Sequence, residues 1–354
     1  MLPYLTDEFG NASSAHAMGR PARRAVEQAR AQVADLLGAN ADEIAFTSCG
    51  SESDNWAIGG YLEANPGRRH IITTRAEHEA VRGLCEHLEQ AGYEVSWLDV
   101  DRQGELDLDQ LEKALRRDTA IVSAMMANNE TGVLFPIREI GQIVREHSDA
   151  VFHVDGVQAV GKVPIDMNQL PVDLFSISGH KFHAPKGVGA LYIRRGIKLP
   201  PFIIGGGQEQ GRRSGTEAVP NVVAMGRAAQ LAKESSEHDR IYQLRNYLED
   251  EVLRRFANAQ VNGTTDRAKR LPNTSNISFA EREGSEIRAQ LDASGICVST
   301  GSACSADSRE ASGVLRAMNI PYEVARGAIR FSLGRYNTPV EIEEALAALE
   351  QILN

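Results

Sequence analysis

The segment from Val151 to Gly189 constrains the fold of this 354-residue chain more than any other stretch. It contains two short apolar runs, 151–154 and 173–177, and polar or small residues follow each of them at once. Each run predicts a buried strand of a parallel sheet, and ligands of such sheets bind at the carboxyl ends of the strands. The polar side chains expected there are Asp155, Gln158, Ser178, His180 and Lys181.

An acid after one of these strands and a lysine after the other can reach one small molecule from two sides. In enzymes that use pyridoxal phosphate (PLP), a lysine forms the Schiff base and an acid pairs with the pyridinium nitrogen. Asp155 and Lys181 therefore indicate a PLP site. A capping lysine and a turn-forming aspartate would give the same short pattern, so the rest of the chain has to decide between them.

Length and composition place the chain among ordinary globular enzymes. A chain of 354 residues favours two domains, and its hydrophobic content of 42% is typical of a globular protein. No apolar run reaches the length of a membrane span, and the first residues do not resemble a secretory signal. A net charge of −10 disfavours nucleic acid as the main partner. Four scattered cysteines predict reduced thiols, a cytoplasmic location and no metal site.

Strands and helices are expected to alternate over residues 1–235, which predicts an α/β domain with a mostly parallel sheet. The expected strands are 43–46, 70–73, 93–98, 120–126, 151–154, 173–177 and 188–193, and the expected helices are 13–38, 53–63, 77–90, 108–116 and 136–146. A polar loop, 205–216, has the length of a functional loop. A helical stretch, 219–257, spans the predicted domain boundary.

Residues 236–354 predict a smaller α+β domain. Its expected strands are 276–279, 296–299 and 328–332, and its expected helices are 285–293, 313–318 and 339–352. Near the other end of the chain, TSCGSESDN joins an expected strand to an expected helix, and the free N–H groups of such a helix end bind anions. Gly50 and Ser51 could hold a phosphate there, although a simple serine cap at the helix start is the more common use of these residues.

Five motifs occur in a characteristic order: HVDGVQAVGK, SISGHKFHAPKGVGALY, GGGQEQGRRSGT, STGSACS and IRFSLGR. Together they resemble the cysteine desulfurases of the NifS/IscS type, which are PLP enzymes of the class V aminotransferase group. The resemblance covers nearly the whole chain. It implies the PLP-transferase fold seen in aspartate aminotransferase, a homodimer, and a reaction that takes sulfur from L-cysteine, leaves L-alanine and forms a persulfide on an enzyme cysteine. Iron–sulfur cluster assembly or thiolation proteins would then accept the sulfur.

The resemblance also implies a role for each matched residue. Lys181 would bind PLP covalently, Asp155 would keep the pyridinium nitrogen protonated, and Gln158 would bind the phenolic oxygen. His78 would stack on the ring and exchange protons, whereas Asn129 and Arg330 would hold the substrate. Cys304 would attack the substrate sulfur. The phosphate group would be held by Ser178, His180, Gly50, Ser51 and, from the neighbouring subunit, Thr216.

The four cysteines differ in their surroundings. Cys304 lies in the small, polar segment STGSACSADSREASG, which predicts an exposed loop that can carry sulfur to an acceptor. Cys297 follows an isoleucine in an expected strand, and Cys85 lies in an expected helix, so both are predicted to be buried in the core. Cys49 adjoins the expected phosphate loop, and the sequence leaves its role open.

Three features depart from the family pattern. Relatives carry about twenty more residues at the N-terminus, with an early strand that is missing here, and the N-terminal segment is expected to pack with the small domain. The phosphate loop reads SCGSES where relatives have SGATES, so Cys49 would be strained if its backbone needed a positive φ. DGVQ replaces DATQ or DAVQ, and we expect little effect because Asp155 and Gln158 are kept.

Two other functions fit parts of this pattern. One is a class V lyase that acts on selenocysteine or cysteine sulfinate, which would not need Cys304 for persulfide transfer. The other is a truncated scaffold protein without activity, against which the retained Lys181, Asp155, Cys304 and Arg330 argue. The residues leave open the sulfur acceptor and the preference for cysteine over selenocysteine.

Overall fold

The computed structural model describes residues 1–301 and 312–353. Its chain contacts divide these residues into two compact units. Unit 1 consists of Met1–Trp97, Leu108–Met126 and Pro136–Ser235, and unit 2 consists of Leu98–Asp107, Ala127–Phe135 and Ser236–Asn354. No helix in the described part of the chain is long and apolar enough to cross a membrane.

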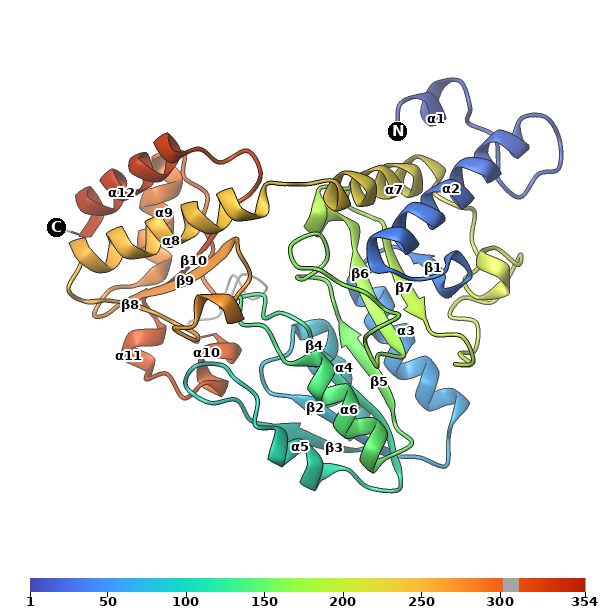
Figure 1. The fold of residues 1–354 in the computed structure, drawn as a ribbon, viewed down its shortest axis with the longest axis horizontal. Helices are drawn as coiled ribbons and strands as arrows, with labels where there is room; N and C mark the ends of the chain where they lie inside the picture. Colours follow the sequence, from blue (N-terminus) through green and yellow to red (C-terminus); the bar gives the residue numbers. More distant parts are fainter. Residues whose placement is uncertain (302–311, 354) are drawn as a thin grey trace. The chain divides into compact units, whose positions relative to one another are not determined.

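Unit 1 is built on a seven-stranded sheet with the order β1-β7-β6-β5-β4-β2-β3 (Figure 1). The central neighbours β2, β4, β5 and β6 run parallel, whereas β7 is antiparallel to both β6 and β1. This agrees with the mostly parallel sheet predicted from the sequence. The strands are β1 (Ile44–Thr47), β2 (His70–Thr74), β3 (Glu94–Leu98), β4 (Thr119–Met125), β5 (Val151–Asp155), β6 (Leu174–Ser178) and β7 (Gly189–Ile193).

The helices of unit 1 follow the apolar spacing of the sequence. In α2, buried alanines and valines recur every three or four residues, and Gly38 ends the helix in the left-handed conformation with φ 61°. This buried stripe of α2 packs on α7. The helices are α1 (Pro3–Thr6), α2 (Gly19–Leu37), α3 (Gly50–Ala64), α4 (Glu79–Gln90), α5 (Leu108–Ala114), α6 (Ile137–His147) and α7 (Val219–Lys233), with short 3₁₀ turns at Ala41–Glu43, Gly179–Phe182 and Glu209–Gly211.

The carboxyl ends of β5 and β6 are positioned by a core that covers one face of the sheet. Trp56, Ala57 and Ile58 of α3 and Val81 of α4 pack there against apolar side chains of β1, β2, β4, β5, β6 and β7. Helix α3 contacts the four strands from β4 to β7, so the residue that begins it, Gly50, is fixed relative to the ends of β5 and β6.

Unit 2 has a three-stranded antiparallel sheet with the order β10-β9-β8 and its own core. Phe279 of β9, Phe331 of β10 and Leu349 of α12 pack together in that core with residues of α8 and α9. The elements are α8 (His238–Arg255), β8 (Ala259–Val261), a 3₁₀ turn (Arg267–Lys269), β9 (Thr274–Phe279), α9 (Gly284–Ala293), α10 (Gly313–Ala317), α11 (Tyr322–Ala325), β10 (Ala328–Ser332) and α12 (Pro339–Leu353).

Two expectations about elements were wrong. The stretch 219–257 is not one helix, because α7 ends at Lys233 and α8 begins at His238. The stretch 296–299 is not a strand, since it forms a single bridge between Ser299 and Arg330. Residues Met1–Trp97 belong to unit 1, where α1 contacts α7, and the packing of the N-terminal segment with the small domain stays a prediction.

Candidate active site

The ends of β5 and β6 bring the predicted acid and lysine together. Asp155 is buried, and its Oδ1 accepts a hydrogen bond of 2.9 Å from the backbone N–H of Val157. Burial raises the pKa of this carboxyl group, and the hydrogen bond from Val157 and electrostatic interactions with His78 and Lys181 partly oppose that rise. A buried carboxylate that interacts with a nearby lysine and a nearby histidine can also form an ion pair with a cationic ring nitrogen.

Two further side chains are already oriented by the protein. Gln158 accepts a weak 3.4 Å hydrogen bond through Oε1 from the Lys162 ammonium group, so its amide N–H₂ is the end that can donate to a ring oxygen. His78 caps α4, because its Nδ1 accepts a 3.1 Å hydrogen bond from the N–H of Ala80. The ring of His78 therefore has Nε2 as the nitrogen through which it can exchange a proton.

The expected phosphate residues gather around the start of α3. Ser178 Oγ lies 3.1 Å from His180 Nδ1. A Cβ atom added to Gly50 would lie 2.7 Å from Val157 Cγ2 and 3.4 Å from Ser178 Cβ, so only glycine fits between these neighbours. Burial lowers the pKa of His180, and the nearby Lys181, Lys186 and Lys162 lower it further. These positive charges and the N-terminal end of α3 favour an anion there.

The arrangement in unit 1 fits PLP. The buried acid suits the ring nitrogen of the cofactor, and the nearby lysine suits its aldehyde. The start of α3, where only glycine fits and positive charges lie nearby, suits its phosphate. The expected strain at Cys49 is absent, because its φ of −170° is extended backbone that any residue adopts. Ser51 is exposed in the first turn of α3, next to Gly50.

Thr216 is exposed at the end of the loop 205–216. The middle of this loop is fixed to the rest of unit 1 by Glu209, whose carboxylate accepts hydrogen bonds of 2.6 and 2.9 Å from Arg30 and one of 2.8 Å from the N–H of Phe46. Glu209 and Gln210 both have left-handed backbone, with φ of 50° and 60°, so the buried contacts hold a strained turn.

Unit 2 carries the predicted substrate residues Asn129 and Arg330. Arg330 Nη1 donates a 2.8 Å hydrogen bond to the backbone carbonyl of Asn129, and Asn129 Oδ1 is buried with no hydrogen-bond partner in the described part of the chain. The backbone of Arg330 also pairs with Ser299, which precedes the cysteine segment. A guanidinium group and an amide held side by side can bind a carboxylate.

Glu130 lies beside both ends of the cysteine segment. Ser312 donates a short hydrogen bond to Glu130 Oε2, and a Cβ atom added to Gly301 would lie 2.4 Å from the same oxygen. Cys304, the predicted nucleophile, lies outside the described residues. The described flanks of its segment are therefore held in unit 2, next to Arg330 at one end and Glu130 at both.

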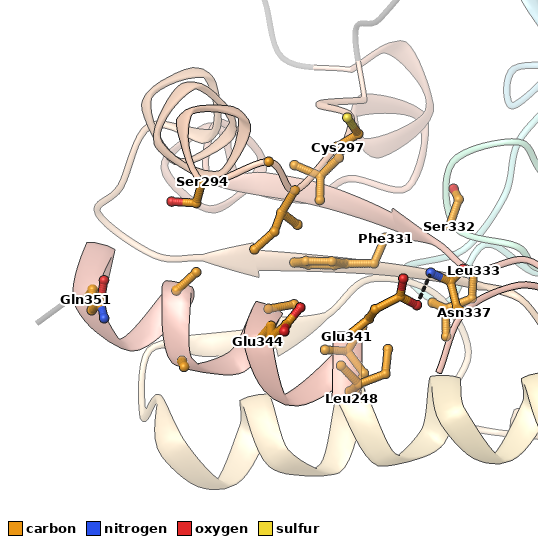
Figure 2. A pocket seen from close by; sticks show the side chains of 17 residues that line it. Leu248, Ser294, Cys297, Phe331, Ser332, Leu333, Asn337, Glu341, Glu344 and Gln351 are labelled. Atoms are coloured by element: carbon orange, nitrogen blue, oxygen red, sulfur yellow. Dashed lines mark hydrogen bonds between the residues drawn. The ribbon is translucent and has the colours of Figure 1, made fainter. Parts of the chain in front are cut away.

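The expectation for Cys297 was wrong, because its side chain is exposed. Cys297 lines a pocket of about 760 Å³ in unit 2, opposite Phe331 and the helix that carries Glu344 (Figure 2). The segment pairs with β10 only at Ser299, two residues after Cys297, so the apolar residues around Cys297 are not part of a sheet. Cys85 is buried as expected, and burial raises the pKa of its thiol to about 12.

Sequence reasoning missed three buried polar residues behind Asp155. Asp54, Glu77 and His153 are at most 4% exposed, and they come from α3, the loop before α4, and β5. His153 was visible as a polar residue inside an apolar strand, and Asp54 lies within the predicted anion-binding stretch TSCGSESDN, three residues after Ser51. Both signals could have indicated that polar groups lie on the inner side of the site.

Gly156 is more constrained than expected, and we predict that Gly156→Ala destabilises the fold. A Cβ atom at Gly156 would lie 1.8 Å from Cζ of Phe175, so the ring or the strand must move. Overpacking of this kind costs about 1–3 kcal/mol of unfolding free energy. Urea unfolding should show this loss, and Phe175→Leu combined with Gly156→Ala should restore most of it. An unchanged stability of Gly156→Ala would contradict this account.

Comparison with known proteins identifies the family. Residues 1–345 match the family described as Aminotransferase class-V. Over its full length the chain is 52% identical to "Cysteine desulfurase 2" of Trichormus variabilis and covers 88% of that protein. It is also 48% identical to "Cysteine desulfurase NifS" of Azotobacter vinelandii, again with 88% of the relative covered. The chain belongs to the cysteine desulfurases of the class V aminotransferase family.

The solved structures agree with this assignment. A "NIFS-LIKE PROTEIN" shares 39% identity and superimposes with a TM-score of 0.93 over 99% of this chain and 93% of that one. "SspA in complex with cysteine" shares 34% identity, with a TM-score of 0.82, 95% of this chain covered and 94% of that one. The fold is therefore that of the NifS-like class V enzymes, and cysteine desulfurases of this family depend on PLP.

Proposed function

We propose that this cysteine desulfurase takes the sulfur from L-cysteine, releases L-alanine and passes the sulfur through Cys304 to an acceptor protein. The observation that carries the proposal is the placement of Asp155 and Lys181 at the ends of neighbouring strands, beside a start of α3 that suits a phosphate. SspA, a structural relative of 34% identity, binds cysteine in its solved structure, which supports cysteine as the substrate.

Each residue has a defined part in this reaction. PLP supplies an electron sink when it is bound. Asp155 holds the negative charge opposite the ring nitrogen, Gln158 donates to the phenolic oxygen, and His78 and Lys181 move protons. The arrangement of Arg330 beside Asn129 suits the substrate carboxylate.

The sulfur step forms one bond and breaks one. The Cys304 thiolate attacks the substrate sulfur, an S–S bond forms, and the C–S bond breaks with its electron pair left on the substrate carbon. A proton from the enzyme then completes L-alanine. Release of the persulfide sulfur as sulfide needs an external thiol, which also provides the two electrons for this step.

We further propose that the enzyme is a homodimer in which Thr216 reaches the phosphate of the partner subunit. The loop that ends at Thr216 follows an exposed apolar stretch, Phe202–Ile204, in which Ile204 is 89% exposed. Exposed apolar side chains next to a well-anchored loop are typical of a subunit interface. Iron–sulfur assembly or thiolation proteins are the proposed acceptors, and the cytoplasm is the proposed location, where thiols stay reduced.

The test compares two cysteine variants of the purified enzyme. We expect the wild type to produce equal amounts of sulfide and alanine from L-cysteine with a thiol reductant, and Cys304→Ala to lose at least about 10²-fold in sulfide rate, because the nucleophile is removed. Cys297→Ala is the matched control, since Cys297 is also exposed in unit 2, and it should keep the wild-type rate. Full turnover by Cys304→Ala would contradict persulfide transfer and favour a lyase on another substrate.

A further inference from the structure

Three carboxylic acids lie together inside unit 1, and their different contacts favour a different protonation state for each kind of site. Asp54, Glu77 and Asp155 are 1%, 4% and 6% exposed. Asp155 is paired in the sheet with Met125 of β4 and with Ser176 of β6. Glu77 accepts a hydrogen bond from the N–H of Met125, and Asp54 is hydrogen-bonded to the Ser176 side chain, so both acids lie next to Asp155. Burial raises the pKa of Asp54 and of Glu77, repulsion from Asp155 raises both further, and Glu77 adds to the rise at Asp54. Three negative charges in one buried site would repel one another strongly, so most of the cluster must be neutral.

Asp54 has one hydrogen bond that favours its charged form, with the Ser176 side chain, and it does not outweigh burial. Its Oδ1 is buried and has no hydrogen-bond partner in the described part of the chain. The nearest basic group is His153, whose Nε2 lies 3.5 Å from that oxygen. His153 is neutral, because burial lowers its pKa to about 3, and its two ring nitrogens lie 2.8 and 3.0 Å from the hydroxyls of Ser123 and Ser176. Within the described residues, Asp54 therefore has no cation as an ion-pair partner.

Glu77 is only half satisfied. Its Oε1 accepts hydrogen bonds of 2.9 Å from the Thr74 hydroxyl and 2.9 Å from the N–H of Met125. Its Oε2 is buried without a partner in the described part of the chain, which is where a proton can reside. The titratable groups that face Glu77 are Asp155 from β5, Asp54 from α3 and the Cys85 thiol of α4, none of them a cation.

Asp155 differs from the other two acids. Its Oδ1 accepts the N–H of Val157, and its charged form is favoured by electrostatic interactions with His78 and with the Lys181 ammonium group. When one member of a coupled group ionises, the charge settles where cations and donors can balance it.

We propose that Asp54 and Glu77 are positioning residues of the cofactor site, which carry protons at neutral pH and leave Asp155 as the ionised member of the cluster. Asp155 thereby presents one negative charge to one pyridinium nitrogen. The inference rests on the proposed cofactor site, but it concerns side chains whose protonation can be measured without turnover.

The test is infrared spectroscopy of the full chain as purified and after cofactor removal. Protonated carboxylic acids give a C=O band apart from carboxylate bands. We expect such bands at neutral pH, with Glu77→Gln removing one and Asp54→Asn removing another. Burial and Asp155 raise the pKa of Glu77 to about 8, so its band should disappear as the pH rises through that value. In Asp155→Asn the midpoint should move to lower pH, because the repulsion is gone.

A second readout follows the stability of the same variants. The pKa of Glu77 rises from an ordinary 4.5 to about 8 in the folded protein, so the folded state binds the proton more tightly between these values. Stability therefore falls as pH rises through this window and levels off above it. The wild type should lose more melting temperature between about pH 5 and about pH 8 than Glu77→Gln does, by several degrees.

Two results would overturn the proposal: no protonated-acid band in the wild type at neutral pH, or a Glu77 midpoint that Asp155→Asn leaves unchanged. Binding of PLP to the wild type is measured separately, by the absorbance of the cofactor. Failure to bind would contradict the proposed function and leave the carboxylic acid bands as an independent measurement.

Discussion

Replacing Asp155 with asparagine lowers the rate of sulfide formation by about 10²–10³-fold while the protein stays as stable as the wild type or becomes more stable. The magnitude is that of removing one electrostatic contact aimed at the reacting group in a buried site. Asparagine has the same size and keeps an oxygen for the N–H of Val157, so the local backbone should not change. It cannot carry the negative charge that a pyridinium nitrogen requires.

The stability half of this prediction follows from the direction of the pKa shift. Burial raises the pKa of Asp155, which means that the folded protein without cofactor holds this charge at a cost near pH 7. A neutral amide removes that cost. Thermal unfolding and sulfide assays on the same preparations check both halves, with Asp35→Asn, an exposed acid paired with Lys233, as the control. A fall in both stability and activity would show that Asp155 is mainly structural.

The sequence was a reliable guide where local chemistry decides the structure. The strand that ends at Asp155 and the helix that ends at Gly38 could be predicted because apolar spacing and a left-handed glycine depend on neighbouring residues. The alternation of strands and helices then indicated that Asp155 and Lys181 would meet, since the ends of parallel strands share one edge of the sheet. The family motifs added the roles of these side chains.

Features set by distant contacts could not be predicted in this way. Ile296 and Cys297 are residue types typical of a strand, yet the segment pairs with β10 only at Ser299. Cys297 is exposed as a result. The tight fit at Gly156 depends on Phe175, a residue of the neighbouring strand.

The acid cluster was missed for the same reason. Asp54 and Glu77 lie 23 positions apart in the sequence and come close only after α3 and β2 have packed on the sheet. The strain expected at Cys49 assumed a backbone conformation that its neighbours do not impose, since its φ is −170°.

Replacing Arg30 with methionine should destabilise unit 1 by about 3–5 kcal/mol, because it leaves the buried Glu209 carboxylate without its cation. The two side chains are 3% and 5% exposed, and Arg30 Nη1 lies 2.6 Å from Glu209 Oε2. Arg30 also donates a 3.0 Å hydrogen bond to the carbonyl of Ile44, so α2, β1 and the loop of Thr216 all lose a contact. Chemical unfolding measures the loss, and cofactor retention should fall with it if Thr216 binds the phosphate.

A double-mutant cycle separates the charge from the packing. Arg30→Met combined with Glu209→Leu removes both charges, and we expect it to recover most of the stability lost by Arg30→Met alone, as buried ion pairs replaced by apolar residues often do. Lys233→Met is the matched control, because its 2.6 Å pair with Asp35 is exposed and should contribute less than about 1 kcal/mol. Equal losses for Lys233→Met and Arg30→Met would show that burial does not set the strength of the Glu209 anchor, and that the strained turn at Gln210 is held by other contacts.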